Sequence, residues 1–180
     1  TPTGNDYIEM RAKGFEEISP QRKYHGISTQ IIAQIKNVRV PFNVDIGVGD
    51  IIVPHAEERT INTQLPDFEA PVIKTYSLES TIAEKFDAIL QRFELTGRMK
   101  DFYDIYYLSR TFDFEGAKLQ AAIFETLQRR GTPYDRDSFK RVVALGDDED
   151  MQKRWKFFLK TIKDNTLEFS FVITEIQTFL

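Results

Sequence analysis

The sequence predicts an α+β protein in which a β-sheet region precedes a helical bundle. Two observations lead to this prediction. In the first half, apolar and polar residues alternate at every second position, most clearly over residues 38–46. From Ser77 onward, apolar residues recur instead at the three- and four-residue spacing of helices. We therefore expect a mixed or antiparallel sheet within residues 1–74 and a helical region over residues 75–180.

The sheet region contains one clear hairpin. Residues 31–35 and 38–46 both alternate, and residues 36–37 fit the turn between them. Pro41 cannot donate a ladder hydrogen bond, so its strand is expected at a sheet edge or a bulge. Residues 54–74 contain three prolines and few periodic apolar residues, and they are expected to form a long connecting segment.

Five helices are expected in the second half. Ser77 and Asp113 have side chains that can accept amide hydrogen bonds at a helix start, and Gly131 fits a helix end. The first helix is expected to turn Asp87 and Gln91 toward water. The fourth carries an apolar stripe made of Met151, Trp155, Phe158 and Ile162. The expected helices cover residues 77–93, 98–109, 114–130, 148–163 and 167–180.

Composition excludes several classes of site. The 180 residues include no cysteine, which rules out disulfides and cysteine-based zinc sites and fits a reducing cytosol. Two histidines make a histidine-rich metal centre an unfavoured interpretation. No apolar run approaches the ~18 residues of a membrane span, and the first ten residues lack the pattern of an export signal. We expect a cytoplasmic protein without a membrane partner.

The net charge of −4 has the wrong overall sign for a general nucleic-acid-binding protein. A local basic run remains, made of Lys153, Arg154, Lys156, Lys160 and Lys163. This run fits either a solvated helix face or a local patch that binds RNA.

Ionised residues are expected on the packed side of the first two helices. A helical wheel places Lys85 at the edge of the first apolar arc. Arg98 and Asp101 fall inside the apolar arc of the second helix, with Asp104 at its margin. Because an unpaired buried ion is costly, these groups must pair or line a polar cleft. Two interpretations stay open: a Lys85–Asp101 salt bridge that only specifies packing, or a pocket for an anion or a metal.

Asp45 raises the same question on the strand at 38–46, where it lies opposite the apolar face. It fits a surface carboxylate without a role, or a ligand-binding carboxylate. Asp50 is typical of a turn. The neighbouring Gly47 and Gly49 lack the strand–loop–helix context of a phosphate-binding loop.

Three segments carry a resemblance to a known family: FNVDIGVGDIIVP at 42–54, YSLESTIAEKFDAILQR at 76–92 and TGRMKDFYDIYYL at 96–108. Together they resemble the AbiEii/AbiGii nucleotidyltransferases, toxins of bacterial abortive-infection and toxin–antitoxin systems. The resemblance covers roughly residues 5–130, and the last fifty residues match only as a generic helical tail.

The resemblance implies catalytic roles for Asp45, Lys85 and Asp101. Asp45 matches the third acidic residue of the nucleotidyltransferase fold and would be a ligand of Mg²⁺ in the complete protein. Lys85 would neutralise triphosphate charge, with Arg98 and Asp104 as further nucleotide-binding residues. The implied substrate is a nucleoside triphosphate, the implied acceptor is RNA or protein, and the implied partner is a cognate antitoxin.

The sequence also departs from the family pattern. The Gly-Gly/Ser helix start and the Asp-x-Asp strand of the family are not found upstream of Asp45. We therefore expect either a fragment or a natural short form. This chain alone is expected to be inactive, because one carboxylate cannot hold two metal ions. The alternative function is a non-catalytic module that binds a nucleotide or a protein.

Overall fold

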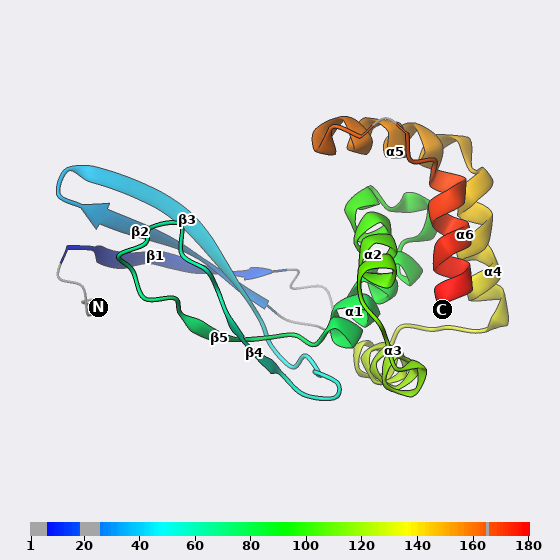
Figure 1. Ribbon diagram of the computed structural model, residues 1–180, viewed down its shortest axis with the longest axis horizontal. Coiled ribbons are helices and arrows are strands. Elements are labelled where there is room, and N and C mark those ends of the chain that lie inside the picture. Colours follow the sequence, from blue (N-terminus) through cyan, green and yellow to red (C-terminus); the bar gives the residue numbers. More distant parts are fainter. Residues whose placement is uncertain (1–6, 19–25, 165) are drawn as a thin grey trace. The chain divides into compact units, whose positions relative to one another are not determined.

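The computed structural model describes residues 7–18, 26–164 and 166–180 (Figure 1). Contacts divide the chain into two compact units, Thr1–Asp50 and Ile51–Leu180. Strands form the first unit, and a short hairpin followed by helices forms the second. The predicted α+β class is confirmed.

The first unit is an antiparallel sheet of three strands in the order β1-β2-β3. The strands are β1 (Glu9–Ile18), β2 (Gly26–Ile35) and β3 (Val38–Gly47). The predicted hairpin is confirmed, with a turn at residues 36–37. Pro41 lies on β3, an edge strand of the described sheet, as its missing amide hydrogen predicts.

The sequence did not indicate β1. Its residues EMRAKGFEEI are mostly charged or small, and nearly all are exposed. A register shift between Ala12 and Phe15 also interrupts its pairing with β2. This bulge breaks the alternation that would have revealed the strand.

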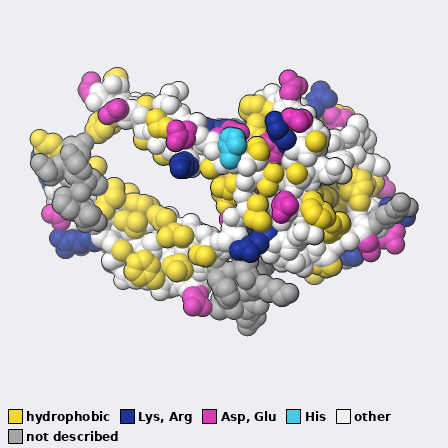
Figure 2. All heavy atoms as spheres, turned by 90° about the horizontal axis from the view of Figure 1, so that it is seen from below, with side chains coloured by type: hydrophobic (Ala, Val, Ile, Leu, Met, Phe, Trp, Pro, Cys, Tyr) yellow, Lys and Arg dark blue, Asp and Glu magenta, His cyan; other side chains and the backbone are white. Residues whose placement is uncertain are grey.

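Apolar side chains line one face of β3. Those of Val38, Val40, Phe42 and Ile46 are between 39% and 56% exposed. Hydrophobic side chains gather over the sheet in Figure 2. Among the described residues of this unit, only Gly26 and Thr29 are buried. The sheet therefore has almost no core of its own.

The second unit opens with a hairpin that the sequence analysis missed. β4 (Glu57–Thr60) pairs antiparallel with β5 (Val72–Thr75), from Glu57↔Thr75 to Thr60↔Val72. Residues 54–74, predicted as a long connecting segment, therefore include most of a β-hairpin. Each strand has four residues and β4 is charged, so neither shows enough alternation to be recognised.

Six α-helices follow in the described residues: α1 (Leu78–Leu90), α2 (Met99–Thr111), α3 (Gly116–Arg130), α4 (Arg136–Ala144), α5 (Glu149–Ile162) and α6 (Phe169–Phe179). Ser77 caps α1 by accepting the Ser80 amide hydrogen bond, as predicted. Gly131 ends α3 with a φ of 64°, also as predicted. The predicted cap at Asp113 was wrong, because α3 begins two residues later with Glu115 in the cap position. Helix α4 was not predicted.

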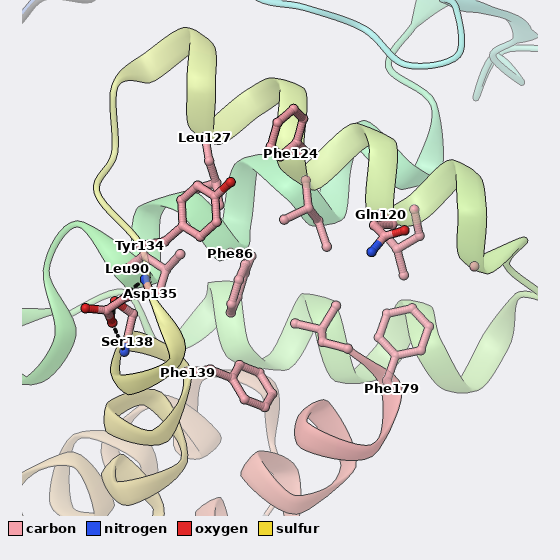
Figure 3. A pocket seen from close by; sticks show the side chains of 14 residues that line it. Phe86, Leu90, Gln120, Phe124, Leu127, Tyr134, Asp135, Ser138, Phe139 and Phe179 are labelled. Carbon is pink, nitrogen blue, oxygen red and sulfur yellow. Dashed lines mark hydrogen bonds between the residues drawn. The ribbon is translucent and has the colours of Figure 1, made fainter.

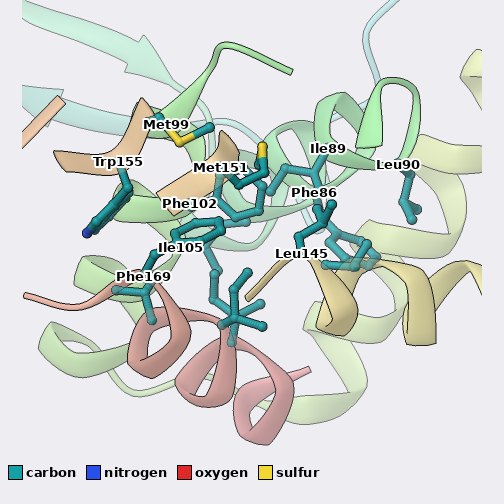
Figure 4. Packing of buried hydrophobic residues seen from close by; sticks show 14 of the residues in the cluster. Phe86, Ile89, Leu90, Met99, Phe102, Ile105, Leu145, Met151, Trp155 and Phe169 are labelled. Atoms are coloured by element: carbon teal, nitrogen blue, oxygen red, sulfur yellow. The ribbon is translucent and has the colours of Figure 1, made fainter. Parts of the chain in front are cut away.

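The core of the second unit lies among these helices (Figure 4). Phe102 on α2 meets Phe169 on α6 edge to face at 5.2 Å, and Trp155 on α5 lies 5.3 Å from Phe169. Helix α2 lies beside α6 (Figure 1). Met151 and Trp155 of the predicted stripe are buried, whereas Ile162 at the end of α5 is 38% exposed. These aromatic contacts hold α2 against α6.

Protonation of Asp135 is expected to weaken the start of α4. Its side chain accepts a 2.7 Å hydrogen bond from the Ser138 amide, and this bond lowers the pKa of the Asp135 carboxyl. The stabilisation is therefore complete above the unfolded pKa of about 3.9 and is lost as the pH falls through the lower folded pKa. Urea midpoints of wild type and Asp135→Asn should differ more at about pH 6 than at about pH 3. A difference independent of pH would contradict this role.

Candidate functional site

The central feature of the candidate site is Lys85 on α1, which faces two carboxylates of α2. Its Nζ lies 2.5 Å from Asp104 Oδ2 and 3.5 Å from Asp101 Oδ1. The side chain of Asp101 is 3% exposed, and those of Lys85 and Asp104 are 20% and 19% exposed. Asp101 is thus withdrawn from water, whereas Lys85 and Asp104 keep partial contact with it.

Two further cations complete this group. Arg98 Nε lies 2.5 Å from Asp101 Oδ2, and Lys100 Nζ lies 2.6 Å from Asp104 Oδ2. The hydrogen bond to Asp101 raises the pKa of Arg98, so the guanidinium stays charged. We call these five residues the Lys85 cluster. It holds three cations against two carboxylates, a surplus of one positive charge that suits an anionic ligand.

Local sequence explains how the Lys85 cluster forms. The spacings of Arg98 to Asp101 and of Lys100 to Asp104 are three and four residues, so each pair lies on one side of α2. Asp101 also lies in the first turn of α2, where the helix dipole favours a carboxylate. Val53 fixes the start of α1, since its amide donates a 2.7 Å hydrogen bond to Ser80 Oγ. Lys85 is therefore positioned two turns into a helix with an anchored start.

The structure brings together four of the residues singled out in the sequence: Lys85, Arg98, Asp101 and Asp104. The Lys85–Asp101 ion pair is present, but Asp104, expected at the margin, makes the shorter contact. Lys100 was not singled out from the sequence. It is exposed, yet it contacts Asp104, and its four-residue spacing to Asp104 was the signal that could have revealed it.

Asp45 lies on β3 in the first unit. It pairs in register with Ser28 of β2, whose Oγ donates a 2.6 Å hydrogen bond to Asp45 Oδ1. Glu16 of β1 is the next residue in the same row across the sheet. Asp45 is thus exposed on the polar face of the strand, as the alternation predicts. That it joins the Lys85 cluster in one site remains a prediction.

The expectation that Asp87 faces water was wrong, because its side chain is completely buried. Its carboxylate accepts hydrogen bonds from Gln91, from Arg130 Nη1 at 3.0 Å and from Thr132. Helix α3 packs against the side of α1 that the wheel assigned to solvent. Arg130 also pairs with Glu84, so this second charged group joins α1 to the end of α3. These contacts give this charged group a structural role, which is to hold α1 against α3.

Apart from the Lys85 cluster, a cavity of about 640 Å³ lies among α1, α3, α4 and the end of α6 (Figure 3). Phe86, Phe124, Phe139 and Phe179 are among the mainly apolar side chains around it. Asp135, the one ionised side chain in its lining, is held by the α4 cap. This cavity offers apolar surface but not the charge that phosphate chemistry requires.

Acidic and histidine side chains are the candidate metal ligands of this chain. Among residues 7–18, 26–164 and 166–180, no group of three or more His, Asp or Glu side chains is placed to hold a metal ion. The described residues therefore do not form a complete magnesium site, and Asp45 could supply only part of one. Within the same residues, no helix has both the length and the apolar character that crossing a membrane requires.

Of the comparisons with known proteins, one gives a match. Neither the curated proteins nor the solved structures compared with the chain give a match. A family described as "Nucleotidyl transferase AbiEii toxin, Type IV TA system" matches residues 2–175. The match continues through residue 175 and so includes most of the last fifty residues, which the resemblance had covered only as a generic helical tail. This description places the family in a toxin–antitoxin system, which implies an antitoxin partner. The chain belongs to the AbiEii family of nucleotidyltransferase toxins.

Proposed function

We propose that this protein takes part in the transfer of a nucleotide from a nucleoside triphosphate to an RNA or protein acceptor. The observation that carries the proposal is the Lys85 cluster, in which a lysine is held by two carboxylates and a net positive charge remains. Membership of the AbiEii family supports the same reaction class. Lys85 and Arg98 hold the triphosphate, and Asp101 and Asp104 position the two cations.

The reaction needs charge neutralisation more than covalent help from the protein. An acceptor hydroxyl loses its proton to water and attacks the α-phosphorus. The bond from that phosphorus to the oxygen that bridges it to the β-phosphorus breaks, and pyrophosphate leaves with the bond's electron pair. Negative charge builds up on the leaving pyrophosphate, where a fixed cation stabilises it. Lys85 is suited to this role because its two contacts to α2 fix the ammonium in place before the substrate arrives.

Magnesium, which the reaction class implies, would neutralise phosphate oxygens when bound. Asp45 is the carboxylate that we assign to it. Since the described residues do not supply a complete set of ligands, we assign no step to the metal. For the same reason the 180-residue chain alone should bind a triphosphate without transferring the nucleotide.

Label transfer tests the proposal. At its full natural length, the protein should incorporate label from one of the α-³²P-labelled nucleoside triphosphates into cellular RNA or cellular protein. Ribonuclease and protease digestion identify the acceptor. Asp45→Asn should remove incorporation, whereas Asp67→Asn, which changes an exposed aspartate between β4 and β5, should not. Equal activity of the two variants would exclude Asp45 from the site.

A non-catalytic nucleotide-binding module is the second candidate. The observation that favours it is the absence, among the residues that the structure describes, of an acidic group able to hold a metal. This candidate predicts that nucleoside triphosphates bind without turnover even at full natural length. Incorporation of label by that form would eliminate it.

A further inference from the structure

A groove lies next to the Lys85 cluster, between the start of α2 and the outer side of α5. Its volume is about 680 Å³. Arg98 and Lys100 line it from α2, and Lys153, Arg154 and Phe157 line it from α5. Arg154 Nη1 donates a 2.8 Å hydrogen bond to the Thr96 carbonyl, which ties α5 to the turn before α2. The two walls are therefore held at a fixed spacing.

The groove is basic although the chain is acidic. Four of its lining residues are cations and one, Asp101, is a carboxylate. Arg98, Lys100 and Lys153 have side chains that are 55%, 72% and 70% exposed. Each contacts an aspartate, but water screens the pair between Lys153 and the similarly exposed Asp150, so a phosphate can compete for that lysine. Lys100 has further N–H donors beside its contact to Asp104, and these can bind a phosphate as well. Several cations that line one groove can contact successive phosphates of a polynucleotide backbone.

Phe157 adds a feature that binding of a simple anion does not require. Its side chain is 73% exposed, whereas the neighbouring Phe158 packs against Trp155 at 5.4 Å and Tyr103 at 5.7 Å. The core thus holds Phe158, while Phe157 presents its ring to solvent beside the cations. Exposed aromatic rings between basic residues are typical of sites where unpaired bases stack.

We propose that this groove binds a single-stranded polynucleotide. The phosphates contact Lys100 and Lys153, and a base stacks on Phe157. A duplex fits less well, because its bases already stack on one another. The binding itself is independent of the proposed function. The role that we assign to it, holding the acceptor strand, rests on that function.

Fluorescence anisotropy tests the proposal on the complete chain without added triphosphate. Fluorescein-labelled oligouridylate and oligothymidylate of twelve nucleotides serve as probes for RNA and DNA. Phe157→Ala should weaken binding about 5- to 150-fold, the range expected for the loss of one stacked base. Phe124→Ala, which removes a ring 44% exposed on α3, should leave the affinity unchanged. Circular dichroism verifies that both variants are folded.

Salt dependence tests the phosphate contacts separately. Lys153→Gln should reduce the slope of log affinity against log salt by about 0.7, the value for one contact to a single strand. Lys140→Gln is the matched control, since Lys140 contacts Asp137 as Lys153 contacts Asp150, each at 3.0 Å. The control should keep the wild-type slope.

Several results would overturn the groove proposal. The first is that neither oligonucleotide binds, and the second is that a duplex binds with equal affinity. The third is that Phe157→Ala binds as tightly as wild type, which is the behaviour expected if the groove attracts any polyanion or anionic vesicle. The relative affinity for the two probes shows whether RNA or DNA is preferred. If Phe157→Ala binds normally while Lys85→Met loses transfer, the groove proposal fails and the proposed function stands. If Phe157→Ala loses binding while Lys85→Met transfers normally, the reverse holds.

Discussion

In the protein at its full natural length, replacement of Lys85 by methionine is expected to lower nucleotide transfer at least about 100-fold, because a fixed cation at the developing negative charge is lost. Folding should change little. Methionine retains the apolar stem, Asp101 keeps its 2.5 Å contact to Arg98, and Asp104 keeps its 2.6 Å contact to Lys100. We expect the free energy of unfolding to fall by no more than about 1–2 kcal/mol. Label transfer and urea denaturation on the same preparation give the two quantities.

The matched control is Lys140→Met, which removes an exposed lysine paired with Asp137. It should retain both transfer and stability. If Lys85→Met instead unfolds readily but transfers nucleotide at the wild-type rate when folded, the Lys85–Asp101 pair only specifies the packing of α1 on α2.

Replacement of Trp155 by alanine is expected to be the most destabilising of these changes, by about 4–5 kcal/mol. Its side chain is 1% exposed and packs against Phe169 and Phe158, so the truncation leaves a cavity. The indole Nε1 also donates a 2.7 Å hydrogen bond to the Leu167 carbonyl, which would lose this partner. Thermal unfolding followed by circular dichroism at 222 nm should show a fall in Tm on the order of 10 °C.

Two variants separate the parts of this effect. Trp155→Phe keeps a ring in the core but loses the hydrogen bond, so it should lose roughly half as much stability or less. Phe157→Ala, on the exposed side of the same helix, should stay within about 0.5 kcal/mol of wild type. A similar Tm for Trp155→Ala and Phe157→Ala would contradict the burial of Trp155.

The sequence was sufficient where a single strong local signal decides the structure. The strict alternation around Phe42 predicted β3, and the turn at residues 36–37 predicted its partner β2. Ser77 and Gly131 set the start of α1 and the end of α3, because a side-chain cap and a positive φ are local requirements. Such features do not depend on the rest of the fold.

Elements decided by pairing with distant residues were missed. Strand β1 is charged and bulged, and β4 and β5 have four residues each, so cross-strand pairing and not alternation defines them. Helix α4 is nine residues long and depends on a capping box between Asp135 and Ser138, which the spacing of apolar residues does not reveal. Short elements carry too few periods for a pattern to appear.

In the candidate site, too, local patterns predicted some residues, and residues that depend on distant contacts were missed. Charges placed on the packed side of helices correctly singled out Lys85, Arg98, Asp101 and Asp104 as a set of neighbours. The helical wheel failed for Asp87, because α1 is covered by α3 on one side and contacts α2 on another. A wheel assumes one buried face, and no local pattern reveals a second. The basic groove was missed because Phe157 and Arg98 come together only in the folded unit.

The most direct test of the central claim is the preference of the protein for a triphosphate over the monophosphate of the same nucleoside. Equilibrium dialysis with magnesium chloride in the buffer gives the two affinities for wild type, Lys85→Met and Lys140→Met. If Lys85 serves the triphosphate, wild type and Lys140→Met should prefer it at least about tenfold, equivalent to about 1.4 kcal/mol, and Lys85→Met should lose that preference. An unchanged preference in Lys85→Met would show that Lys85 only neutralises Asp101 and Asp104 within a packed interface.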